Sequence, residues 1–77
     1  DQLAELISNA ETSFYNGQLQ EAFSLYLSAI KLDENCADAY QCAANVCMSL
    51  SRYEDAIEYY QKVQIYIMLI TQIEMNL

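Results

Sequence analysis

The most informative features of this chain of 77 residues are the residue types it lacks, because it contains no proline, no histidine and no tryptophan, and only one glycine, Gly17. Proline and glycine are the residues that most often interrupt helices. With 55% hydrophobic residues that recur at three- and four-residue steps, the chain is predicted to be all-α. Without histidine the most common general base is missing, and no glycine-rich phosphate loop is present. We therefore expect no enzymatic activity, no catalytic residue and no cofactor.

Basic residues are also scarce, with three Lys and Arg against eleven Asp and Glu, for a net charge of −8. Phosphate contacts require a basic surface, so the composition argues against a nucleic-acid partner. Anionic membrane surfaces are disfavoured for the same reason. The charge is compatible with basic peptide partners, although solubility is its simplest explanation.

The chain has three cysteines, Cys36, Cys42 and Cys47, and no Cys-x-x-Cys pair. Without histidine they cannot complete a common zinc site, so we expect no metal site. Buried or half-buried free thiols are typical of a reducing compartment. No targeting segment is recognisable, and the run from Ile65 to Ile70 is too short for a membrane span. We therefore expect a cytoplasmic protein.

Two stretches of the chain, 3–36 and 37–70, follow the same pattern at an offset of 34 residues, since 44 − 10 = 34. Three identities carry this offset: Ala10 and Ala44, Ala22 and Ala56, Tyr26 and Tyr60. Each stretch holds two helical segments that are separated by a short break, with Gly17 in the first break and Ser51 in the second. A fixed period of this length is typical of repeat proteins. We expect helices at 3–16, 19–32, 37–50 and 53–76, the last of them overlong.

With this period, the paired alanines and the segments 20–26 and 53–60, the chain resembles the tetratricopeptide repeat (TPR) family over residues 3 to about 66. The resemblance implies two antiparallel helix-turn-helix repeats that form a short solenoid. We expect a single domain over 1–77, with repeats at 3–36 and 37–70 and an apolar helical tail at 63–77. The alternative is an ordinary four-helix domain in which the 34-residue spacing is a coincidence.

The resemblance also implies a groove that is lined by the first helix of each repeat. The candidate groove residues are Ile7, Glu11, Phe14, Tyr15, Gln41, Asn45 and Met48. Some family members hold a partner's C-terminal carboxylate with basic and amide side chains at these positions. Here only Asn45 is of a suitable type, and Glu11 would repel a carboxylate, so we expect no binding of that kind.

The tail is the second candidate surface, because residues 63–70 are apolar almost all round and a helix of that kind must be buried on every side. Its candidate docking residues are Tyr60, Ile65, Ile67, Met68, Ile70, Ile73 and Leu77. Three alternatives remain open. The tail pairs with a second copy as a homodimer, it docks the next repeat of a larger array or another protein, or the chain turns near 68–71 and folds back as a cap.

Together these features predict a non-catalytic protein-protein interaction module that works as an adaptor, a co-chaperone or an assembly subunit. It would bind a protein or peptide partner in its groove, and self-associate or dock through the C-terminal helix. Two alternatives remain, a purely structural oligomerisation unit and a small chaperone that masks an apolar segment of a client.

Overall fold

The computed structural model describes residues 1–76 and contains four helices and, within that part of the chain, no strand. They are α1 (Gln2–Tyr15), α2 (Leu19–Leu32), α3 (Ala37–Ser49) and α4 (Tyr53–Asn76). The prediction of an all-α fold is therefore confirmed. Each helix begins and ends within one residue of its expected position, and α4 is overlong as expected.

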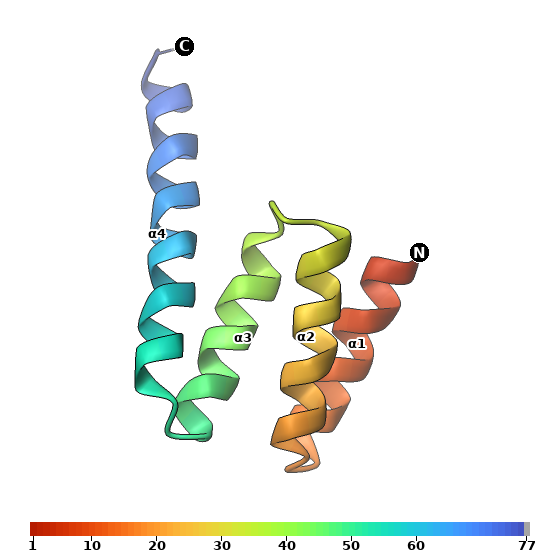
Figure 1. The fold of residues 1–77 in the computed structure, drawn as a ribbon. Coiled ribbons are helices and arrows are strands. Elements are labelled where there is room, and N and C mark those ends of the chain that lie inside the picture. The colour runs from red at the N-terminus through yellow and green to blue at the C-terminus, as the bar shows by residue number, and fades with distance from the viewer. Residues whose placement is uncertain (77) are drawn as a thin grey trace.

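The helices lie side by side in chain order, and each runs antiparallel to the next (Figure 1). Extensive packing joins α1 to α2, α2 to α3 and α3 to α4. The result is a molecule of 43 × 31 × 18 Å. Helices α1 and α3 share few contacts with each other, although both pack on α2. The space between α1 and α3 is therefore open on the side opposite α2.

The turns that end α1 and α3 have the same backbone geometry. In the first, the amide of Gln18 donates to the carbonyl of Ser13 at 2.8 Å, and Gly17 has a φ of 80°. In the second, the amide of Arg52 donates to the carbonyl of Cys47 at 2.8 Å, and Ser51 has a φ of 62°. Both are helix terminations of the Schellman type, which require a left-handed residue. Serine thus adopts the conformation that glycine adopts in the first turn.

Small residues form much of the core, and they allow the helices to approach closely. Seven alanines are fully buried: Ala10, Ala22, Ala29, Ala39, Ala43, Ala44 and Ala56. They include the two alanine pairs that revealed the 34-residue offset. Larger buried side chains, such as Tyr26 and Val46, fill the space between them.

A row of aromatic rings joins α2, α3 and α4, which the sequence analysis did not anticipate. The ring of Tyr40 lies between Tyr59, at 6.2 Å between centroids, and Tyr66, at 5.9 Å. Tyr59 in turn contacts Phe23 edge-on at 6.2 Å. Such pairs add about 0.5–1.5 kcal/mol each beyond the area they bury. The row therefore stabilises the attachment of α4 to its neighbours.

Both basic side chains near this row lie over aromatic faces. The guanidinium of Arg52 is 5.4 Å from the centroid of Phe23, and the ammonium of Lys62 is 5.4 Å from that of Tyr40. Contacts of this kind contribute about 0.5–1 kcal/mol when they are exposed. Two of the three basic residues of the chain thus help to hold the helices together.

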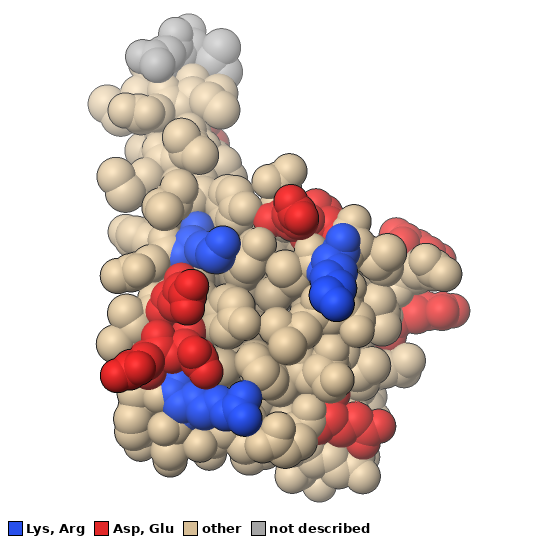
Figure 2. Space-filling model, viewed as in Figure 1, with Lys and Arg blue, Asp and Glu red and all other residues tan. Residues whose placement is uncertain are grey.

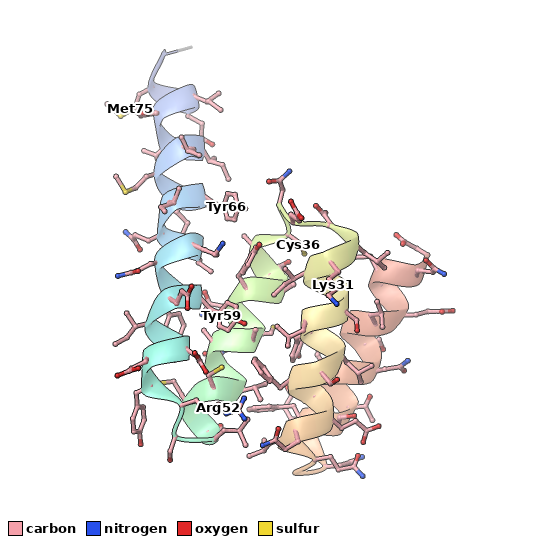
Figure 3. The ribbon with its side chains drawn as sticks, in the orientation of Figure 1. Lys31, Cys36, Arg52, Tyr59, Tyr66 and Met75 are labelled. Carbon is pink, nitrogen blue, oxygen red and sulfur yellow. The ribbon has the colours of Figure 1, made fainter. Side chains whose placement is uncertain are left out.

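Tyr66 makes the hydrogen bond that joins α4 to the rest of the molecule at the furthest point along the helix. Its hydroxyl donates to the backbone carbonyl of Glu34, in the α2–α3 connection, at 2.7 Å. Figure 3 shows Tyr66 pointing from α4 toward the body of the molecule and Met75 pointing away from it. Beyond Tyr66, α4 continues as an unbroken helix to Asn76. The alternative in which the chain turns near 68–71 and folds back is therefore wrong.

Candidate interaction surfaces

A small depression lies between α1 and α3, at the place where the sequence predicted a groove. Its walls are formed by Glu11, Phe14 and Tyr15 of α1 and by Cys42 and Asn45 of α3. The floor is Tyr26 of α2, whose side chain is only 3% exposed. The depression has a volume of about 170 Å³, which is room for one long side chain.

Four of the seven candidate groove residues line this depression: Glu11, Phe14, Tyr15 and Asn45. Ile7 instead packs half-buried against the core. Gln41 and Met48 are exposed on α3 and are not among the residues that line the depression. The groove therefore involves fewer of the candidate residues than predicted, and those that line it surround a single depression.

Sequence reasoning missed Tyr26 as a lining residue, whereas Cys42 lies on the groove face that the resemblance implies. Tyr26 lies on the second helix of its hairpin and was assigned to the apolar stripe, so its hydroxyl was not considered. Its equivalent at an offset of 34 is Tyr60, whose hydroxyl donates to the side-chain oxygen of Asn45. The same offset pairs Asn45 with Glu11, since 45 − 34 = 11. The offset therefore relates the two tyrosines and the two polar residues, but it does not show that Tyr26 lies beneath the depression.

The charges around the depression have one sign. Helices α1 and α3 contain Glu5, Glu11 and Asp38 and no lysine or arginine. Burial raises the pKa of the Cys42 thiol most, the hydrogen bond with Tyr26 partly offsets this, and the carboxylates of Glu11 and Asp38 raise the pKa further. The pKa of Tyr26 is raised chiefly by burial, then by its interaction with Cys42, and also by Glu11. Both lining groups thus experience a negative potential and remain uncharged at neutral pH.

The basic residues lie elsewhere on the molecule. Lys31 is in the last turn of α2, Arg52 lies between α3 and α4, and Lys62 is on α4. All three are visible on the face drawn in Figure 2, in which α1 lies behind α2. No basic side chain is therefore available on α1 or α3 to neutralise Glu11.

The second surface is the projecting half of α4, which rises beyond the α2–α3 connection (Figure 1). Five of the seven candidate docking residues are at least half exposed there: Ile65, Ile67, Met68, Ile70 and Ile73. Leu69 and Met75 belong to the same surface, and neither was a candidate. Tyr60 is half-buried and bonded to Asn45, so it joins α4 to α3 instead, and Leu77 lies outside the described residues.

The projecting half carries almost no charge. Between residues 63 and 75 the only ionisable acid or base besides Tyr66 is Glu74. Figure 2 shows this part of α4 as a nearly uninterrupted surface of uncharged side chains. Exposed apolar surface of this extent is typical of an interaction site.

The apolar residues of α4 form one continuous stripe that passes from the packed half into the projecting half. Ala56, Tyr59, Val63 and Tyr66 are buried or half-buried, and they follow one another at steps of three and four residues. The same alternation of steps continues to Ile70 and Ile73, which are 56% and 61% exposed. The stripe that packs α4 on α3 therefore continues past the first residues of α3, and there its side chains are exposed to solvent.

Metal-ligating side chains do not cluster in the described residues. Among residues 1–76, no group of three histidine, cysteine or acidic side chains could hold a metal ion. Cys36 and Cys42 are half-buried and Cys47 is buried, all three as free thiols. None of the described helices combines the length and the apolar character that crossing a membrane requires.

No protein-family model matches this chain, and no curated protein resembles it significantly. What the chain binds is therefore inferred from the two surfaces described above.

Proposed function

We propose that this chain is a non-catalytic protein-protein interaction module of the TPR type, which self-associates through the projecting half of α4 and binds a peptide in the groove between α1 and α3. The observation that carries the proposal is the apolar stripe of α4, which continues past its packing partner. Two residues of the stripe, Ile70 and Ile73, are more than half exposed although the same stripe is buried below them. A helix of this kind is stable in water when a second surface covers it.

A second copy of the chain would cover the stripe on both copies at once. Fully burying an isoleucine side chain contributes about 1.5–3 kcal/mol, so covering a half-exposed one contributes about 1 kcal/mol. In a two-fold symmetric pair every such residue counts twice. Ile70 and Ile73 of the stripe, together with the neighbouring Ile67, would therefore supply about 6 kcal/mol, which matches the lower part of the ~4–15 kcal/mol that association costs. The other exposed residues of the tail add to this sum.

The groove supports the second half of the proposal. The buried ring of Tyr26 gives the depression a rigid floor, and Tyr15, which is 83% exposed, stands at its edge. Exposed tyrosines at pre-formed hollows are common anchors in protein interfaces. The groove thus offers one defined site for a side chain of an extended partner.

The experiment that tests self-association is a measurement of absolute mass by light scattering after size exclusion, at several protein concentrations. The variant is Ile70→Glu with Ile73→Glu, which places charge on the stripe without altering any buried side chain. The matched control is Gln2→Glu with Gln20→Glu, which adds the same charge at exposed positions of α1 and α2. We expect a dimer for the parent and the control, and a folded monomer for the stripe variant.

A parent protein that stays monomeric at every concentration would contradict self-association. The exposed residues on the other side of the tail would then favour the second candidate function, a small chaperone that covers an apolar client segment. That candidate is supported by Ile65, Met68 and Leu69, which border a shallow open depression of their own. A dimer whose groove binds nothing would instead favour a purely structural oligomerisation unit.

A further inference from the structure

We infer that the depression between α1 and α3 binds the cationic side chain, lysine or arginine, of an extended basic peptide segment. This inference rests on the proposed function and assigns the chemistry of the groove partner. It depends on three features of the site, which are its shape, its charge and its aromatic edge.

The shape limits the occupant to a single side chain. The walls come from two helices that share few contacts, and Tyr26 closes the bottom. A volume of about 170 Å³ does not admit a helix, but it admits one long side chain whose backbone runs along the rim. The depression therefore holds one side chain of a bound segment and not the segment itself.

The charge selects a cation. Glu11 lines the depression, and its nearest charged companion on α3 is the carboxylate of Asp38, which also acts on Cys42. Neither α1 nor α3 supplies a basic side chain that would pair with Glu11. In the second hairpin the equivalent position holds Asn45, which is neutral and already accepts a hydrogen bond from Tyr60. Of these two equivalent positions, only that of Glu11 carries a charge. The carboxylate of Glu11 therefore repels an acidic peptide.

The aromatic edge favours the same occupant. Phe14 and Tyr15 lie edge to face, with their centroids 6.0 Å apart and an interplanar angle of 79°. Tyr15 is 83% exposed at the edge of the depression, so its ring is accessible to a side chain that enters there. A cation is attracted both by an aromatic face and by a carboxylate, and arginine satisfies the two together through its planar fork.

The test uses four pools of labelled peptides with a fixed central residue, Arg, Lys, Glu or Leu, and mixed flanking residues. Binding to the full chain is measured by fluorescence anisotropy, and the site is located by chemical-shift changes of backbone amides. The protein variants are Glu11→Gln, and Glu21→Gln as the matched control, because Glu21 is exposed on α2 and is not among the lining residues. Both substitutions replace exposed side chains, so both variants are expected to fold.

We expect the Arg and Lys pools to bind and to shift the amides of Glu11, Tyr15 and Asn45. Glu11→Gln should weaken this binding about fivefold, the upper range for a partly exposed ion pair, and Glu21→Gln should not change it. Preferred binding of the Leu or Glu pool at the same amides would overturn the cation assignment and leave the peptide groove intact. Shifts confined to the acidic residues at the start of α4 would show a non-specific charge effect and overturn the inference. Absence of any binding at the groove would overturn both the inference and the groove half of the proposed function.

Discussion

The two hairpin turns permit a matched pair of substitutions, because Gly17 and Ser51 adopt the same left-handed backbone at equivalent places. Gly17 has a φ of 80° and Ser51 a φ of 62°. A residue with a Cβ atom pays about 1–2 kcal/mol in this conformation, and glycine does not. Gly17→Ala is therefore expected to destabilise the protein, and Ser51→Gly to stabilise it.

The magnitude follows from the surroundings of the two residues. A Cβ atom at position 17 would meet no other atom within 4 Å, so the cost of Gly17→Ala is conformational only. The loss of chain entropy in the unfolded state offsets about 0.4–1 kcal/mol of that cost. The net change is about 1 kcal/mol in the free energy of unfolding for each variant, with opposite signs. For a domain of this size, 1 kcal/mol corresponds to a shift of about 4–8 °C in Tm.

Thermal and urea unfolding followed by circular dichroism would measure both changes. The control is Ser49→Gly, the same substitution in the last residue of α3, where glycine is expected to cost about 0.5 kcal/mol relative to serine. Ser51→Gly should thus raise Tm while Ser49→Gly lowers it. If both serine substitutions destabilise the protein to the same extent, the turn at Ser51 does not carry the strain that its φ implies.

Two further predictions concern the attachment of α4 and the response to alkaline pH. Tyr66→Phe keeps the contact with Tyr40 but removes the hydrogen bond to Glu34, so it should cost about 1 kcal/mol and speed amide hydrogen exchange in α4. Unchanged exchange around residue 66 would contradict this role. Burial raises the pKa of Tyr26 and Tyr59 above the ordinary value of 10.0, so the unfolded state loses these protons first as pH rises. The free energy of unfolding should therefore be constant near neutral pH and fall above pH 10, as urea titrations at increasing pH would show. Tyr26→Phe should make this fall with pH less steep.

The helices could be predicted almost to the residue because their signals are local. Gly17 ends α1, and the three- and four-residue steps of the apolar positions define the lengths of α2 and α3. The length of α4 was predictable for the same reason, since no breaking residue occurs before Asn76. Local rules of this kind act within one or two turns of helix, and they do not depend on how the helices pack.

The aromatic row and the floor of the groove could not be predicted in the same way. Tyr40 meets Tyr66 across 26 residues of sequence, since 66 − 40 = 26, and the contact exists only because α3 and α4 lie antiparallel. Tyr26 was recognised as one of the identities at the 34-residue offset, but the offset does not reveal that its side chain lies beneath the depression between α1 and α3. Contacts of this kind depend on how neighbouring helices lie against each other, which a periodic pattern does not specify.

The distribution of charge explains how a chain with a net charge of −8 can still pair through its last helix. Ten of its eleven acidic residues lie before residue 63, since only Glu74 belongs to the projecting half of α4. Surface charges separated by more than about 8 Å are largely screened at physiological ionic strength. Two tails in contact would therefore bring little like charge together, while the acidic bodies remain apart and soluble. Because the groove is formed by α1, α2 and α3 and includes no residue of α4, a dimer formed this way would leave both Glu11 sites open to a basic partner.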